Sequence, residues 1–203
     1  MPIADKETTL KSIAPISGII VRCVLDAWAD WRASPYAGRW RCKRSRANFV
    51  WEQIVDKCIA QLTGTEGVHI ERRDESFGFF VNDDVFFRIK KADRGGLTSN
   101  VPTQNALAFH DPEKDLFGFR PIQRVEIVYQ LNPLETEVAD VAVVARDGAK
   151  VAWSERLLKS AQVLSATSPM DDAARKDSQT RKRLTRLKKS DGNPDVGQQN
   201  TGT

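Results

Sequence analysis

Apolar residues recur at intervals of three, four or seven positions through the first part of the chain, between Leu10 and Trp31. This spacing is typical of an amphipathic helix that buries one stripe. Pro15 and Gly18 weaken its first half, and Pro35 ends it, because the residue before a proline is driven out of helical backbone angles. The pattern predicts a first helix over about residues 8–33. The apolar stripe consists of Leu10, Ile13, Ile20, Val24, Ala27, Trp28 and Trp31.

A second helical pattern covers about residues 45–63 and has a broader apolar face. Ser45 is a suitable N-cap, because its hydroxyl oxygen can accept a hydrogen bond from a free backbone N–H. Gly64 suits the left-handed position that follows the last turn of many helices. A second helix is therefore predicted directly after a basic loop. Its apolar face consists of Val50, Trp51, Ile54, Val55, Cys58, Ile59 and Leu62.

From Val68 onward the period changes to the alternation of β-strands, in short segments bounded by Asn, Asp and Gly. Asn82-Asp83 and Asp147-Gly148 are turn sequences between such segments, and the second is a strong hairpin signal. No helix-length crossover separates the strands of either hairpin, so we expect a mainly antiparallel sheet. The predicted strands lie at about 68–72, 77–81, 85–90, 125–131, 138–145 and 150–155.

These elements predict an α+β fold, in which two N-terminal helices pack on a mainly antiparallel sheet at about residues 68–156. We expect a single domain over about 1–158, followed by a disordered tail over 159–203, whose polar composition cannot bury enough apolar surface to fold. The tail is basic, because nine Lys or Arg and five Asp lie from Leu157 onward. That excess equals the net charge of +4 for the whole chain, so the core sums to zero. Within the core, the segment from Arg32 to Arg46 holds six cations and no acid.

The three cysteines, Cys23, Cys42 and Cys58, form no Cys-x-x-Cys pair, which argues against a disulfide framework or a zinc ribbon. Cys23 and Cys58 fall on apolar helix faces and are expected to be buried thiols. Cys42 lies among cations that favour its thiolate. The N-terminus is acidic where a signal peptide is positive, and no apolar stretch reaches the ~20 residues of a membrane span. We expect a cytoplasmic protein without membrane contact.

The connection at about residues 91–122 is long for a compact domain, and such segments often carry function. It contains His110 and Asp111; a histidine there suits acid–base chemistry near neutral pH, and a purely structural loop histidine is the alternative. Glu126 alternates with the apolar face of its strand, so it points either into a cleft or into solvent. His110, Asp111 and Glu126 are the candidate catalytic residues.

Metal and cofactor chemistry find little support in the sequence. His69 and His110 are the only histidines, and neither has a second His or Cys at ligand spacing. The acids lack the acid-x-Lys signature of a two-metal nuclease, since Arg88 stands where that signature needs an acid. Neither a phosphate-binding loop nor a dinucleotide fingerprint is present. We expect no metal and no cofactor.

Two cationic clusters suit an anion or a nucleic acid. In the first, Trp40 lies between Arg39 and Arg41, as in single-strand binders whose aromatic residues stack on bases while cations pair with phosphates. Trp40 either folds back onto the domain or forms an exposed platform. The second cluster runs into Gly95-Gly96, whose backbone N–H groups can approach an anion. The candidates are Arg39, Trp40, Arg41, Lys43 and Arg44 in the first cluster, and Arg88, Lys90 and Arg94 in the second.

Three segments, Val85–Lys91, Gln104–His110 and Asp147–Trp153, resemble a family of uncharacterised bacterial proteins. These look like partners of proteins that join a helix-turn-helix domain to a zinc-peptidase-like domain in toxin–antitoxin and phage-defence modules. The resemblance covers about residues 70–155 and transfers no active-site residue. It implies one component of such a pair, with a protein partner encoded nearby. Together with the polarised charge of the core, the 91–122 connection and the basic tail, it leads us to expect the toxin or effector, acting through that partner and through nucleic-acid contacts. The alternatives are a standalone nucleic-acid-binding module and a hydrolase that uses the 91–122 connection.

Overall fold

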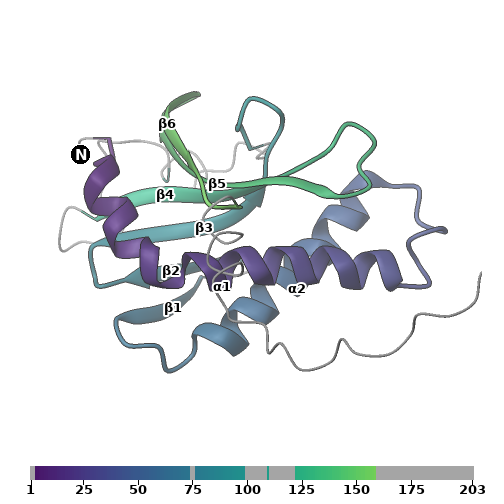
Figure 1. The fold of residues 1–203 in the computed structure, drawn as a ribbon, viewed down its shortest axis with the longest axis horizontal. Helices are drawn as coiled ribbons and strands as arrows, with labels where there is room; N and C mark the ends of the chain where they lie inside the picture. Colours follow the sequence, from purple (N-terminus) through teal and green to yellow (C-terminus); the bar gives the residue numbers. More distant parts are fainter. Residues whose placement is uncertain (1–2, 74–75, 99–108, 110–121, 159–203) are drawn as a thin grey trace, which may run out of the picture. The chain divides into compact units, whose positions relative to one another are not determined.

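The computed structural model describes residues 3–73, 76–98, 109 and 122–158. In this part of the chain two helices come before six strands, which form one sheet (Figure 1). The arrangement confirms the predicted α+β fold with its mainly antiparallel sheet. The predicted tail at 159–203 lies outside the described residues. The elements are α1 (Lys6–Ala33), α2 (Lys43–Leu62), β1 (Val68–Arg73), β2 (Ser76–Val81), β3 (Val85–Lys91), β4 (Gln123–Leu131), β5 (Val138–Asp147) and β6 (Lys150–Arg156).

Helix α1 is longer and more continuous than its sequence predicts. Asp5 caps its N-terminus by accepting a hydrogen bond from the Thr8 backbone N–H at 2.9 Å. The helix then runs through Pro15 without interruption. An internal proline costs about 3 kcal/mol, whereas each fully buried apolar side chain contributes about 1.5–3 kcal/mol, so the buried stripe of α1 offsets the proline. The helix ends at Ala33, directly before Ser34-Pro35, as predicted.

The N-cap of α2 is Cys42, and the prediction of Ser45 at that position is wrong. Cys42 has extended backbone angles, while Ser45 already lies within the first helical turn. A capping hydroxyl contributes only about 1 kcal/mol. Aromatic contacts around the preceding turn, those of Trp40 with Trp31 and Phe49, compete with that preference. The other end follows the prediction, because α2 stops at Thr63 and Gly64 has a positive φ of 82°.

The strands follow one another through the sheet in sequence order, from β1 to β6. Asn82 and Asp83 both have positive φ, of 52° and 56°, as the tight turn between β2 and β3 requires. All neighbouring strands are antiparallel except β3 and β4, which pair in parallel with Phe87 opposite Val125. Because β3 and β4 are parallel, β4 begins at the same end of the sheet as β3, with Gln123 opposite Val85.

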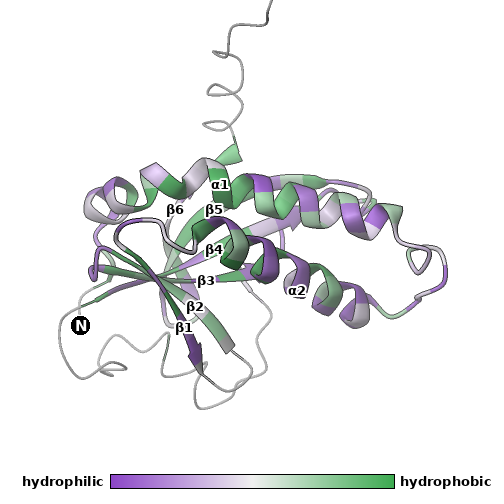
Figure 2. Ribbon diagram, turned by 90° about the horizontal axis from the view of Figure 1, so that it is seen from below, coloured by the Kyte–Doolittle hydropathy of each residue, from purple (hydrophilic) through white to green (hydrophobic). Residues whose placement is uncertain are grey.

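Both helices pack on the same face of the sheet and enclose the main core (Figure 2). The inward positions of β4 are Val125, Ile127 and Tyr129, as the alternation predicts. Phe79 and Phe87 stack with their ring centroids 5.1 Å apart. Trp28, Trp31, Cys23 and Cys58 are buried in this core, as expected from their places on the helical stripes.

The other face of the sheet carries two smaller apolar clusters. In one of them Phe86 packs with Phe80, Ile122 and Phe109, and Phe109 comes from the connection between β3 and β4. Gly78 makes room for the Phe86 ring, because a Cβ atom at Gly78 would lie 2.1 Å from it. The described part of the connection thus lies over the face that the helices leave open.

One described helix, α1, is long and apolar enough to cross a membrane by length and composition, with a mean hydropathy of 1.4 over its most apolar window. Half of that window is buried inside the fold. Core helices of soluble proteins pass the same test. The cytoplasmic location stays a prediction.

Candidate nucleic-acid interface

A groove opens where β2 and β3 separate. These strands pair over only three positions, from Phe79 opposite Phe87 to Val81 opposite Val85. Beyond that point no described strand pairs with this edge of β3. Trp51 of α2 lies in the gap and donates its indole N–H to the Ile89 carbonyl at 3.1 Å. The groove results from strands that diverge before they end, with a helix side chain bridging the opening.

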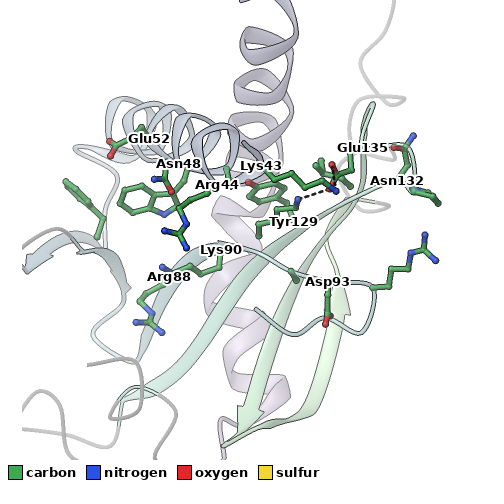
Figure 3. A pocket seen from close by; sticks show the side chains of 18 of the residues that line it. Lys43, Arg44, Asn48, Glu52, Arg88, Lys90, Asp93, Tyr129, Asn132 and Glu135 are labelled. Atoms are coloured by element: carbon green, nitrogen blue, oxygen red, sulfur yellow. Dashed lines mark hydrogen bonds and ion pairs between the residues drawn. The ribbon is translucent and has the colours of Figure 1, made fainter. Parts of the chain in front are cut away.

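The groove encloses about 1440 Å³ between the N-terminal half of α2 and the ends of β1, β3 and β4 (Figure 3). Seven Lys or Arg and three Asp or Glu line it, which leaves an excess of four positive charges. Figure 3 shows Arg44 reaching from α2 toward the part of β3 that carries Arg88 and Lys90. The charged lining residues are Lys43, Arg44, Arg72, Arg88, Lys90, Lys91, Arg94, Glu52, Asp93 and Glu135.

The first turn of α2 has an unusual charge pattern. It contains Lys43, Arg44 and Arg46 but no acidic residue. Free backbone N–H groups make this end of a helix positive, so cations there are unfavourable and anions favourable. These cations therefore do not stabilise the helix itself, and a carboxylate from another element or an anionic ligand beside them would relieve the unfavourable interaction.

Glu135 supplies that carboxylate for part of the cluster. It lies in the β4–β5 loop and forms ion pairs with Arg46, with Lys43 at 3.3 Å and with Lys91 of β3 at 3.2 Å. The hydrogen bond from Arg46 is the main reason why the pKa of Glu135 is lowered to about 2, with Lys91 adding to the effect. Glu135 thus ties the start of α2 to the end of β3 and shapes one wall of the groove.

Replacing Glu135 with glutamine is expected to lower the free energy of unfolding by about 1–2 kcal/mol at pH 7, since it removes charge-assisted hydrogen bonds on a partly exposed residue. The lowered pKa means that this stabilisation is complete above the ordinary value of 4.5 and is lost as the pH falls toward 2. Urea titrations of both proteins at pH 7 and pH 3 measure the difference.

The control for that substitution is Glu155→Gln, which removes an exposed ion pair with Lys6 at 2.8 Å. Exposed pairs contribute little, so this variant should change the free energy of unfolding by less than about 0.5 kcal/mol at either pH. An equal loss in both variants would contradict the special role of Glu135.

Four cations of the groove remain without an ion-pair partner in the described part of the chain. Lys90 is half-buried beside Trp51, with its Nζ atom 5.9 Å from the centroid of the indole ring. Burial, and after it the charge of Arg88, lowers the pKa of Lys90, so a bound anion would relieve the cost of its charge. The unpaired cations are Arg44, Arg72, Lys90 and Arg94.

The other predicted nucleic-acid residues line a second hollow beside the groove. Arg39, Trp40 and Arg41 surround about 610 Å³ at the turn between the helices. Trp40 combines both alternatives left open by the sequence, because it packs against Trp31 at 5.6 Å between ring centroids and is still 40% exposed. The two hollows share Asn48 of α2 in their walls.

Cys42 is exposed at the edge of this second hollow. Backbone N–H groups of Ser45 and then Arg44 lower the pKa of its thiol, and the charge of Arg44 contributes least. The sequence pointed to a lowered pKa through neighbouring cations, whereas the main cause is the position of Cys42 at the start of a helix.

The sequence left open whether Glu126 points into a cleft or into solvent, and in the structure it does neither. It is only 1% exposed and lies between two guanidinium groups, with Arg88 Nη2 at 3.4 Å and Arg146 Nη1 at 3.7 Å. Thr98 donates a hydrogen bond to its second oxygen at 3.0 Å. Both carboxylate oxygens are therefore engaged within the sheet, which suits a buried structural charge better than an acid or base in contact with a substrate.

The remaining catalytic candidates, His110 and Asp111, lie outside the described residues. Phe109 lies with its ring centroid 3.5 Å from the Arg88 guanidinium carbon. Among the residues that the structure describes, no three His, Cys, Asp or Glu come close enough to hold a metal ion.

The structure brings together residues that the sequence kept in separate clusters. Lys43 and Arg44 of α2 line the same groove as Arg88 and Lys90 of β3. Arg94, which follows β3, lines it as well. Sequence reasoning missed Arg72 and Glu135, which have no local signal, and assigned Trp51 to the buried face of α2. Trp51 is half-buried, because β2 turns away and leaves one side of its ring to the groove.

Comparisons with protein families, with curated proteins and with solved structures gave no match to this chain. The resemblance to partners of helix-turn-helix proteins stays a prediction. Any functional conclusion about this protein therefore depends on the geometry and charge of the groove.

Proposed function

We propose that this chain binds nucleic acid through the phosphate backbone in the groove between α2 and β3. The observation that carries this proposal is the set of four cations in one groove that have no ion-pair partner among the described residues. Arginine and lysine are the residues that neutralise phosphates, and this contact supplies most of the affinity of sequence-independent binding.

These cations come from different elements of the fold, which favours a ligand with a chain of phosphates over a single small anion. Arg44 comes from α2, Arg72 from β1, and Arg94 from the segment after β3. They line different walls of an open groove, whereas a site for one phosphate gathers its cations and N–H groups around one point. A chain of phosphates matches this distribution.

The test replaces three exposed groove arginines in the full chain by Arg44→Gln, Arg72→Gln and Arg94→Gln together. Three exposed phosphate pairs are worth about 1.5–3 kcal/mol, so we expect binding of a fluorescently labelled oligonucleotide to weaken by about 10- to 100-fold. Fluorescence anisotropy at 50 mM salt measures the affinity.

The matched control removes the same charge elsewhere, by Lys11→Gln, Arg22→Gln and Lys150→Gln. These three side chains are exposed on α1 and β6 and line neither hollow. The control should lose less than about threefold in affinity, which is the effect of net charge alone. Equal losses in the two triple variants would overturn the proposal, because binding would then depend on overall charge.

The role as toxin or effector of a toxin–antitoxin or phage-defence pair, with a protein partner encoded nearby, stays a prediction beside this proposal. Growth inhibition on expression of the chain alone, relieved by co-expression of the neighbouring gene, would support it. Harmless expression without a complex on co-purification would count against it. A hydrolase that uses the 91–122 connection is the remaining alternative.

A further inference from the structure

An exposed aromatic pair stands at the turn between α1 and α2. Tyr36 and Trp40 stack with their ring centroids 5.1 Å apart and their planes 23° from parallel. They are 47% and 40% exposed, which is high for large aromatic side chains. This aromatic pair presents ring surface to solvent at the turn between the two helices.

Aromatic contacts with the two helices and backbone hydrogen bonds within the turn hold the pair in place. Trp40 contacts Trp31 and Phe49, with ring centroids 5.6 and 6.1 Å away. The backbone N–H groups of Arg39 and Trp40 both donate to the Tyr36 carbonyl, at 2.9 and 3.0 Å. A rigid ring surface loses little conformational entropy when a ligand stacks on it.

Cations neighbour Trp40 along the chain, and the hollow that they line adjoins the basic groove. Arg39 and Arg41 are exposed on either side of Trp40 and form no ion pair with any residue that the structure describes. Their hollow shares Asn48 and Glu52 of α2 with the groove. Trp40 lines this hollow and Tyr36 stacks on Trp40, so a chain that passes from the groove into the hollow reaches the aromatic pair through Trp40.

We infer that the Tyr36–Trp40 pair stacks on an unpaired base, and that the ligand of the groove is consequently a single-stranded nucleic acid. This inference rests on the proposed function. Phosphate contacts alone do not distinguish single strands from duplexes, because both carry the same charged backbone. Stacking does, since the flat face of a base is accessible only when the base leaves its duplex.

The experiment compares four probes on the full chain at one salt concentration: a 20-nucleotide single strand as DNA and as RNA, a DNA duplex of equal length, and inorganic polyphosphate, which has no bases. We expect both single strands to bind at least about 10-fold more tightly than the duplex. A difference in affinity between the DNA and RNA single strands identifies which sugar is preferred and does not contradict the stacking inference.

The variants are Tyr36→Ala and, separately, Trp40→Leu. Each should weaken single-strand binding by about 10-fold and leave polyphosphate binding within twofold, because base stacking is lost while the groove is unchanged. Far-ultraviolet circular dichroism and the urea midpoint show whether the variants are folded. Leu25→Ala, at an exposed apolar residue of α1, is the matched control and should change neither.

Two results have distinct meanings. If the duplex binds as tightly as the single strands, or if both Tyr36→Ala and Trp40→Leu leave single-strand binding unchanged, the inference is overturned while the groove proposal stands. If no probe binds more tightly to the wild type than to the groove triple variant, the proposed function itself fails.

Discussion

Replacing Glu126 with glutamine is expected to lower the free energy of unfolding by about 3–5 kcal/mol, the largest loss from any single substitution considered for this chain. Glutamine keeps the size of the side chain, so the loss comes from charge. It leaves the Arg88 and Arg146 guanidinium groups, both largely buried, without the carboxylate that lies 3.4 and 3.7 Å from them. Urea unfolding followed by tryptophan fluorescence measures the loss.

Two further variants test whether the loss in the free energy of unfolding is specific to the buried carboxylate of Glu126. Glu155→Gln breaks an exposed ion pair and should cost less than about 0.5 kcal/mol. Combining Glu126→Leu with Arg88→Met and Arg146→Met replaces the charges by apolar side chains and should recover most of the stability. If Glu126→Gln costs less than 1 kcal/mol, the cluster does not anchor this face of the sheet.

The affinity for a single strand is expected to fall steeply with salt, and the groove should set a measurable part of that slope. Four unpaired groove cations that neutralise four phosphates give a slope of log affinity against log salt of about −2.8. Affinity should then fall by about 50-fold between 50 and 200 mM salt. Because cations outside the groove also contribute to the slope, the informative quantity is the difference between variants.

The triple variant at Arg44, Arg72 and Arg94 loses three of these contacts and should have a slope shallower by about 2. The advantage of the wild type over this variant therefore shrinks by about 20-fold across the same salt range. Anisotropy titrations at five salt concentrations give both slopes. Parallel lines for the two proteins would show that the groove arginines do not meet phosphates.

Much of the fold was predictable because its signals are local. The apolar stripe of α1 and the alternation in β4 each depend on residues within one element, and the structure places both as expected. The turn at Asn82-Asp83 is equally local, because positive φ is confined to a few residue types. The N-cap of α2 was mispredicted, since packing around the turn competes there with a small capping preference.

The candidate site was less predictable, because its parts are distant along the chain. Arg46 and Glu135 lie 89 positions apart, and Arg88 and Glu126 lie 38 apart. Periodicity showed on which strand face Glu126 lies, yet it did not show that two arginines and Thr98 enclose it. No local pattern reports the partner of a charge on another element.

The sequence by itself determined the fold class, the order of the elements, the buried helix stripes and the cationic segment before α2. Tertiary structure alone decided three things: the parallel pairing of β3 with β4, the early divergence of β2 from β3, and the choice of which cations Glu135 neutralises. The physical reason is that propensity and periodicity act over a few neighbouring residues, whereas strand pairing and ion pairing depend on how distant segments meet in space. The basic groove depends on such contacts between distant segments. Its cations therefore form separate clusters in the sequence and line one groove only in the folded chain.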